Sequence, residues 1–175
     1  IEIGFTKFFD SLPEPFDGLG INANYTYIDS ESKIPPAAEP TDTDGSTYGE
    51  LPYVGISKNS FNVIGMYEKD GFSARLAYNW RSKYLVTTGP NGWNGTDNWQ
   101  GESVRWMLPI YNDDYGQLDM SLGYTFLDNY TVAFDVYNLT QEETKGIMDQ
   151  NVAGENFAYY YSQDVRYSLS LRARF

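Results

Sequence analysis

The chain has 175 residues, a formal net charge of −12, and neither cysteine nor histidine. This acidic balance argues against nucleic-acid binding, which needs a basic surface, and against a polybasic membrane-surface protein. The missing residue types exclude disulfides, thiolate chemistry and the commonest metal ligand and general base. Aromatic residues make up 17% of a chain whose mean hydropathy is −0.50, a mixture typical of strands with one apolar and one wet face.

Alternation of apolar and polar residues with a period of two predicts seven β-strands. No apolar run reaches the ~18 residues of a transmembrane helix, but a transmembrane strand needs only about 9–11 residues. The alternation is clearest in the last segment, where one face is apolar and the other is polar or charged. The expected strands cover about residues 1–9, 19–31, 57–69, 72–84, 115–127, 131–140 and 164–175.

Short and long connections alternate between these strands. The short ones are a Pro-containing turn near 10–18, the pair Asp70-Gly71, and residues 128–130. Asp-Gly between alternating segments is a strong signal for a tight hairpin. The long connections, at about 32–56, 85–114 and 141–162, are expected to be loops, because they are rich in Gly, Pro, Asn, Asp and Trp.

The turns also predict which residues face each other across two hairpins, because turn length fixes the register. A two-residue turn at Asp70-Gly71 predicts that Tyr67 lies opposite Ala74. The partners expected on these grounds are Tyr67 with Ala74, Val63 with Tyr78, Phe126 with Val132, and Leu122 with Phe134.

Short turns at one end and long loops at the other are typical of transmembrane β-barrels. A closed barrel pairs every backbone polar group at membrane depth. With Phe175 at the periplasmic end, the short turns fall on the periplasmic side and the long loops outside. Aromatic residues near the strand ends are expected to form interfacial girdles: Tyr25, Tyr27, Tyr78, Trp80, Tyr124 and Phe126.

Four segments resemble strands near the end of the barrels of TonB-dependent receptors from Gram-negative outer membranes. They are residues 71–84 (GFSARLAYNWRSKY), 116–119 (GQLD), 136–140 (VYNLT) and 167–175 (YSLSLRARF). The resemblance implies a barrel of 22 strands with an N-terminal plug, which takes up siderophores, cobalamin or glycans. It also implies that the barrel-assembly machinery reads the closing strand, through Tyr167, Leu169, Leu171 and Phe175.

We therefore expect an all-β, antiparallel, up-and-down segment of a transmembrane barrel, with about seven of the 22 strands. Residues 1–175 would be its C-terminal portion in the outer membrane, without the plug and without the part that contacts TonB. Its partners would be outer-membrane lipid, the rest of the barrel and the plug. Two alternatives stay open: a complete small outer-membrane barrel, and a secreted β-sandwich module that binds glycans.

Aromatic residues in the long connections are candidate ligand contacts, because aromatic faces beside polar groups suit sugars and other polar solutes. The simpler interpretation is that they pack the loops together. The candidates are Trp93, Trp99, Trp106 and Tyr111.

Charged residues on the polar faces of the strands are expected to face the lumen. They could form a path for a charged solute or a docking surface for the plug. We favour the interpretation that the arginines pair with the carboxylates in a wet lining. The residues are Arg75, Arg81, Asp119, Asp135, Arg166, Arg172 and Arg174.

Catalytic and metal-binding interpretations are weak. The spaced carboxylates of Asp42 and Asp44 lack the further oxygen ligands and the distal Glu of a calcium loop. There is no Gly-rich phosphate loop after a strand, and no pair of carboxylates stands out among 24 acidic residues. We predict no enzymatic activity, no cofactor and no metal site.

Overall fold

The computed structural model describes residues 1–34, 39–42, 46–89, 95–99, 102–106, 108–151 and 153–174, and gives only the backbone of 95–99 and 102–106. The described chain is all-β, and no helix in it is long and apolar enough to span a membrane. The elements are β1 (Glu2–Phe8), η1 (Phe16–Gly18), β2 (Leu19–Tyr27), β3 (Asn59–Lys69), β4 (Phe72–Arg81), β5 (Tyr84–Thr87), β6 (Gly95–Trp99), β7 (Glu102–Trp106), β8 (Ile110–Asn112), β9 (Tyr115–Phe126), β10 (Tyr130–Tyr137), β11 (Thr144–Gln150), β12 (Gly154–Tyr161) and β13 (Arg166–Ala173).

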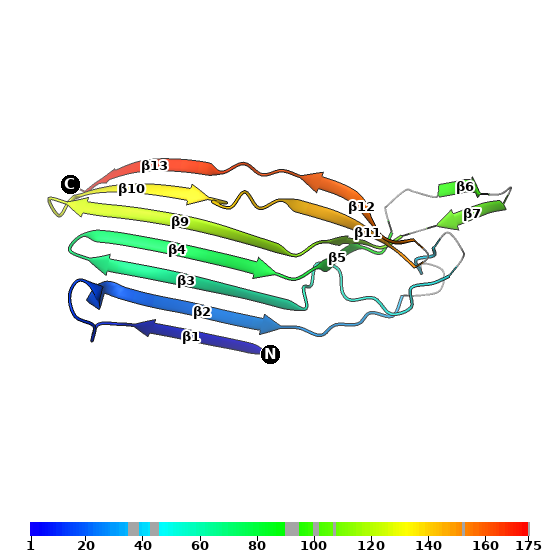
Figure 1. The fold of residues 1–175 in the computed structure, drawn as a ribbon, viewed down its shortest axis with the longest axis horizontal. Coiled ribbons are helices and arrows are strands. Elements are labelled where there is room, and N and C mark those ends of the chain that lie inside the picture. The colour runs from blue at the N-terminus through cyan, green and yellow to red at the C-terminus, as the bar shows by residue number, and fades with distance from the viewer. Residues whose placement is uncertain are drawn as a thin grey trace.

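A seven-stranded antiparallel sheet forms one long wall, in the order β1-β2-β3-β4-β9-β10-β13 (Figure 1). These are the seven strands expected from the alternation, which confirms that part of the prediction. We call the end of the wall with the short connections the turn end and the opposite end the loop end. Within the described residues the sheet is open, because β1 pairs only with β2 and β13 only with β10.

The β3–β4 hairpin has the predicted register, with Tyr67 opposite Ala74 and Val63 opposite Tyr78. Its two turn residues, Asp70 and Gly71, have φ of 51° and 80°. Positive φ at both central positions gives the turn a twist that matches the strands, and it favours Asp-Gly.

The β9–β10 hairpin corrects one predicted pair. Leu122 lies opposite Phe134 as expected, but Phe126 lies opposite Tyr130 and not Val132. The connection is residues 127–129, since β10 already begins at Tyr130. The turn lies one residue earlier than predicted, which shifts the partner of Phe126 by two residues.

The long connections contain strands that the sequence did not reveal. A four-stranded sheet, β12-β11-β8-β5, lies beyond the loop end of the wall, and β6 and β7 form a separate hairpin (Figure 1). With four residues in β5 and three in β8, these strands are too short to show a period-two pattern. The fully buried Leu85 and the nearly buried Leu108 belong to this loop region.

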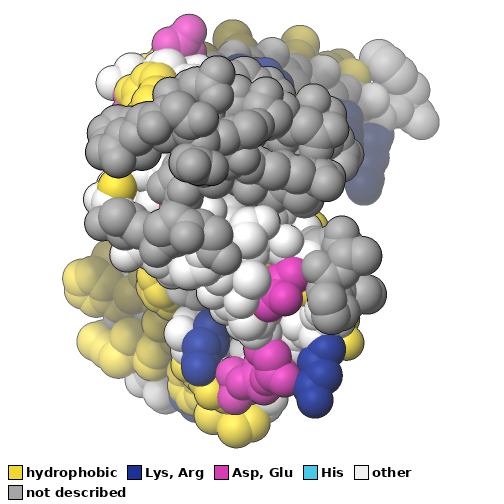
Figure 2. Space-filling view, turned by 90° about the vertical axis from the view of Figure 1, so that its right-hand side faces the viewer, with side chains coloured by type: hydrophobic (Ala, Val, Ile, Leu, Met, Phe, Trp, Pro, Cys, Tyr) yellow, Lys and Arg dark blue, Asp and Glu magenta, His cyan; other side chains and the backbone are white. Residues whose placement is uncertain are grey.

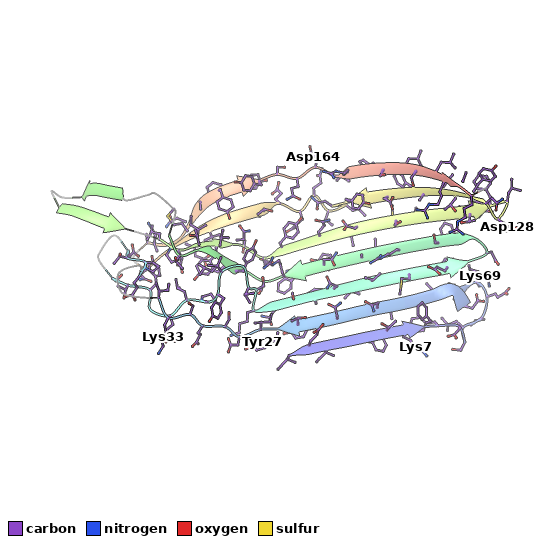
Figure 3. All side chains as sticks on the ribbon, turned by 180° about the vertical axis from the view of Figure 1, so that it is seen from behind. Lys7, Tyr27, Lys33, Lys69, Asp128 and Asp164 are labelled. Carbon is purple, nitrogen blue, oxygen red and sulfur yellow. The ribbon has the colours of Figure 1, made fainter. Side chains whose placement is uncertain are left out.

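The two faces of the wall differ in chemistry, because alternate residues of paired strands point to opposite sides. One face, here called the apolar face, carries large hydrophobic side chains that stay exposed, up to 76% for Leu169. Its members include Ile3, Phe5, Tyr25, Val63, Leu76, Tyr124, Val132, Phe134, Tyr167, Leu169 and Leu171. Side chains follow the strands along the whole length of the wall (Figure 3).

Aromatic rings gather at two levels of the apolar face. Near the loop end, Phe61 stacks on Trp80 with ring centroids 5.3 Å apart. Near the turn end, Tyr67 lies 6.0 Å from Phe72, and Phe126 lies 5.6 Å from Tyr130. The six residue steps from Phe61 to Tyr67 correspond to about 20 Å along the strand, close to the roughly 25 Å apolar band of outer-membrane barrels.

The loop end has a mixed, charged surface. Seen from that end, acidic and basic side chains lie beside one another, and hydrophobic side chains gather along one side (Figure 2). Three ion pairs of the described residues belong to this part of the chain: Lys58 with Asp29 at 3.3 Å, Lys33 with Glu50 at 3.7 Å, and Lys83 with Glu155. All three pairs are largely exposed, so their net stabilisation is small.

Candidate functional site

Four side-chain carboxamides form a row across the polar face of the wall. The strand registers place Asn24 opposite Asn62, Asn62 opposite Asn79, and Asn79 opposite Gln117. Directly paired residues of antiparallel strands project to the same side with Cβ atoms about 5 Å apart. The amides of β2, β3, β4 and β9 therefore lie side by side at one height, which we call the carboxamide row.

The hydrogen bonds of the carboxamide row leave several polar groups available. Asn62 Nδ2 donates to Asn24 Oδ1 at 2.8 Å. Gln117 Nε2 donates to Asp119 Oδ1 at 2.7 Å, while the Tyr115 hydroxyl donates to Gln117 Oε1 at 2.7 Å. Within the described residues, no buried side-chain polar atom lacks a partner, so the unused groups face open space.

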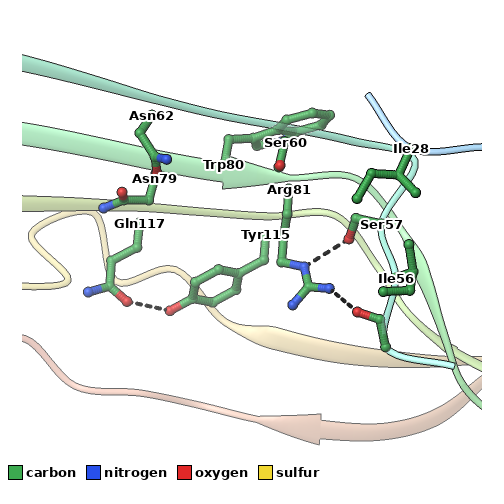
Figure 4. A pocket seen from close by; sticks show the side chains of 11 residues that line it. Ile28, Ile56, Ser57, Ser60, Asn62, Asn79, Trp80, Arg81, Tyr115 and Gln117 are labelled. Carbon is green, nitrogen blue, oxygen red and sulfur yellow. Dashed lines mark hydrogen bonds between the residues drawn. The ribbon is translucent and has the colours of Figure 1, made fainter. Parts of the chain in front are cut away.

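Arg81 lies one step closer to the loop end, opposite Ser60 and Tyr115. Its Nε donates to Ser57 Oγ and its Nη2 to the Gly55 carbonyl, both at 2.8 Å (Figure 4). The guanidinium carbon lies 3.7 Å from the centre of the Tyr84 ring. Arg81 thus fastens residues 55–57 to the wall with hydrogen bonds and a cation–π contact.

A hollow of about 470 Å³ opens over the carboxamide row on the loop-end side (Figure 4). Its polar lining comes from Ser57, Ser60, Asn62, Asn79, Arg81, Tyr115 and Gln117. It shares Ile28 and Ile56 with a hollow of about 300 Å³ among the loops, and Gln117 with one of about 710 Å³ beside β13. The three hollows are therefore neighbours between the loops and the wall.

The strand registers place the charged residues predicted to face the lumen mostly on this polar face. Arg75, Arg81, Asp119, Asp135, Arg166 and Arg172 project from it, and Arg174 follows β13. The expected pairing of arginines with carboxylates does not form in the described residues, whose salt bridges all involve lysines. Neutral neighbouring groups donate hydrogen bonds to the carboxylates instead, because they lie closer to the carboxylates than the arginines do in the strand pairing.

Asp119 and Asp135 show this pattern. Asp119 accepts from Gln117 and from the backbone N–H of Asn138, at 2.7 and 2.9 Å. Asp135 accepts from the hydroxyl of Ser121 at 2.6 Å. Gln117, on the same strand as Asp119, and Ser121, on the strand beside Asp135, reach these carboxylates without the entropy cost of ordering a long arginine.

The aromatic candidates of the loops fall in different places. Tyr111 lies in β8 and lines the hollow among the loops, with Lys83 Nζ 5.0 Å from its ring centre. Burial raises the pKa of the Tyr111 phenol. Trp99 and Trp106 lie in the β6–β7 hairpin, of which only the backbone is described. Trp93 lies outside the described residues.

The residues expected to carry the assembly signal lie on one side of β13. Tyr167, Leu169 and Leu171 project from the apolar face, opposite Val136, Phe134 and Val132. The Tyr167 ring stacks on Phe134 with centroids 6.3 Å apart. Phe175 lies outside the described residues.

Asn138 is an organising residue that sequence reasoning missed. It has φ of 57° and is 4% exposed. Its side chain accepts from the Glu142 backbone N–H and donates to the carbonyls of Glu142 and Gln163, at 2.8–3.0 Å. The sequence predicted that the strand runs to about 140, but β10 ends at Tyr137. Asn tolerates the left-handed conformation better than most residues, so an Asn within the predicted strand is a usable signal for an earlier end.

The loops are also fastened to each other, around the fully buried Asp42. Its Oδ2 accepts hydrogen bonds from the Tyr48 hydroxyl, at 3.2 Å, and from the backbone N–H of Asn151. We call this contact between residues 42–48 and 149–151 the loop latch. Of the two spaced carboxylates weighed as a calcium loop, Asp44 lies outside the described residues. Within the described residues, no cluster of side chains could hold a metal ion.

The family described as TonB dependent receptor-like, beta-barrel matches residues 1–139, which include the wall strands β1 to β4, β9 and β10. No curated protein and no solved structure matches the chain.

Proposed function

Because this chain belongs to the family of TonB-dependent receptor-like β-barrels, we propose that it forms part of the wall of an outer-membrane receptor that takes up a solute. Members of this family are Gram-negative outer-membrane transporters whose barrel works with a plug and with TonB. No enzymatic step is part of the proposal. The solute, whether glycan, siderophore or a similar compound, enters along the polar face.

The observation that carries this proposal is the exposed apolar face of the wall. Leu169 and Leu171 are 76% and 70% exposed, and the face continues across all seven strands. An uninterrupted hydrophobic surface of this extent is unfavourable in water, but it suits the hydrocarbon interior of a membrane. The polar opposite face then lines the interior, as in known transmembrane barrels.

The open edges of the sheet support the placement of residues 1–175 as one portion of a larger barrel. The outer edges of β1 and β13 carry backbone groups that need partners at membrane depth. We propose that further strands of the receptor pair with both edges. The plug and the segment that contacts TonB then lie in another part of the same receptor.

The two ends of the wall support an orientation. Lys69 and Asp128 lie at the turn end, while Tyr27 lies toward the loop end (Figure 3). In outer-membrane barrels the short turns are periplasmic and the longer loops extracellular. We therefore place the four-stranded loop sheet and the loop latch on the cell surface, and β13 runs inward to the periplasm.

The two alternatives have less support. A secreted β-sandwich needs a second sheet packed about 10 Å from the apolar face, and the described residues place no such layer there. A complete small barrel needs β1 and β13 to meet, whereas they form opposite edges of the sheet. The membrane wall explains both observations.

The test compares cells that produce the protein with cells in which its coding region is deleted, each with and without functional TonB. We expect the protein in the outer-membrane fraction, soluble only in detergent, with electrophoretic mobility that changes on boiling. Uptake of its solute should disappear on deletion and also on loss of TonB. Recovery in the aqueous phase, or uptake independent of TonB, would refute the proposal.

A further inference from the structure

We propose that the carboxamide row and the hollow above it bind an uncharged, hydroxyl-rich solute, that is, a neutral oligosaccharide. The inference rests on the proposed function, since it names the class of solute for that receptor. It adds a binding site on the strands of the wall itself, formed by Asn62, Asn79, Tyr115 and Gln117.

The first argument is the supply of hydrogen-bonding groups. A carboxamide offers two N–H donors and a carbonyl acceptor on one rigid plane. Within the described residues, the Asn79 side chain makes no hydrogen bond and Asn62 uses only its Nδ2. Adjacent hydroxyls of a sugar ring each donate and accept, so they match neighbouring amides that do the same.

The second argument is charge. In the part of the chain that the structure describes, Arg81 is the one charged side chain that lines this hollow. It already donates to Ser57 Oγ and the Gly55 carbonyl while it stacks on Tyr84. No carboxylate of the described residues lines the hollow. An anionic solute, such as a ferric catecholate, would therefore meet neutral amides and one occupied cation. Desolvation of a charge without a strong partner is costly, so the lining favours a neutral ligand.

The third argument is shape. The hollow of about 470 Å³ lies within the range of small-molecule sites. The Tyr115 ring borders it, and a hydrogen bond to Gln117 holds its hydroxyl in place (Figure 4). A fixed aromatic ring beside amides can pack against the apolar side of a sugar while the amides bind its hydroxyls. The neighbouring hollows share lining residues with this one and leave room for an oligomer, and they add charged side chains only beyond the carboxamide row.

The experiment uses the protein as its own cells produce it, extracted in detergent, and measures binding by calorimetry. The probes are neutral hexaoses of glucose (α- and β-linked), xylose and mannose, an acidic hexamer of galacturonate, and a ferric catecholate. The variants are Asn79→Ala and Asn62→Ala, with Asn79→Gln as the conservative change. Asn22→Ala is the matched control, because Asn22 lies on the same face nearer the turn end and its amide is bonded to Thr6.

We expect at least one neutral hexaose to bind, and the acidic hexamer and the ferric chelate to bind far more weakly. Asn79→Ala should weaken the hexaose about 5- to 10-fold, as the loss of one or two hydrogen bonds predicts. Asn79→Gln should recover part of this lost affinity. Asn22→Ala should change the affinity for the hexaose less than 2-fold, within the scatter of surface changes. All variants should show the wild-type mobility change on boiling.

Three results would overturn the inference. The first is that no hexaose binds at millimolar concentration. The second is preferred binding of an anionic probe with an affinity that Asn79→Ala leaves unchanged. The third is that the Asn79→Ala variant unfolds at a lower temperature than the wild type in the absence of sugar but binds the hexaose with unchanged affinity. That result would make the carboxamide row a docking surface for another part of the protein.

The inference and the proposed function can fail separately. TonB-dependent uptake of a ferric chelate would leave the receptor function intact and refute only the neutral solute. Hexaose binding to a protein that is absent from the outer membrane would refute the receptor function and leave the site intact.

Discussion

The hydroxyl of Tyr48 donates a hydrogen bond of 2.7 Å to the carbonyl oxygen of Asp149, 101 residues later in the chain. The same hydroxyl lies 3.2 Å from the carboxylate of the fully buried Asp42. This contact joins the connection after β2 to the end of β11. Loops with no shared sequence signal are thereby held together over the loop end of the wall.

Replacing Tyr48 with phenylalanine should loosen the loop latch and leave the wall intact. The change removes the donor to two acceptors, one of them a buried carboxylate, and should cost about 1–2 kcal/mol of local stability. Hydrogen exchange measures this cost, and we expect faster exchange at residues 149–151 with unchanged protection in β3 and β4. Tyr53→Phe is the control, because Tyr53 is 57% exposed and its hydroxyl has no partner among the described residues. Equal exchange in both variants would contradict the latch.

The loop latch should also resist alkaline pH. Burial, followed by the charge of Asp42, raises the pKa of Tyr48 well above the ordinary 10.0. A raised pKa in the folded state means that the contribution to stability is fully present below pH 10.0 and is lost as the pH rises through the folded value. The ultraviolet difference between wild type and Tyr48→Phe isolates this phenol among 16 tyrosines. Ionisation at or below its ordinary pKa would contradict the prediction.

Gly146→Ala should disturb the loop sheet. A methyl group at Gly146 would lie 2.5 Å from Cε1 and Cζ of the Tyr159 ring. The ring must move, which breaks its hydrogen bond to Asn112 and should cost about 1–3 kcal/mol. We expect loss of hydrogen-exchange protection in β11 and β12. Gly65→Ala is the control, since a methyl there meets nothing within 4 Å, and a similar loss in that variant would refute the steric explanation.

Val63→Arg should impair membrane assembly far more than Ile64→Arg. Val63 lies on the apolar face between the two aromatic levels, while its neighbour projects from the polar face. An arginine at the middle of the lipid face of a barrel costs about 2–4 kcal/mol. The effect is measured as the fraction of the outer-membrane protein that keeps the mobility of the folded form in electrophoresis when the sample is not boiled. Equal amounts of the two variants would show that this face does not contact lipid.

Much of the wall could be predicted from the sequence, because its signals are local. Period-two alternation identifies the seven strands, and positive φ at Asp70-Gly71 fixes one register. That register already implies that Asn62 lies opposite Asn79, so half of the carboxamide row followed from the hairpin turn. The last strand likewise has its polar and apolar faces because of its own alternation.

Only the tertiary structure decided the rest, since it depends on pairings between distant segments. Gln117 joins the row because β9 pairs with β4 across the long connection that contains β5 to β8. The loop sheet and the contact of Tyr48 with Asp149 form in the same way. β5 and β8, with four and three residues, are too short to show an alternation of apolar and polar residues. Their pairing is set by burial and loop closure over the whole chain, not by neighbouring residues.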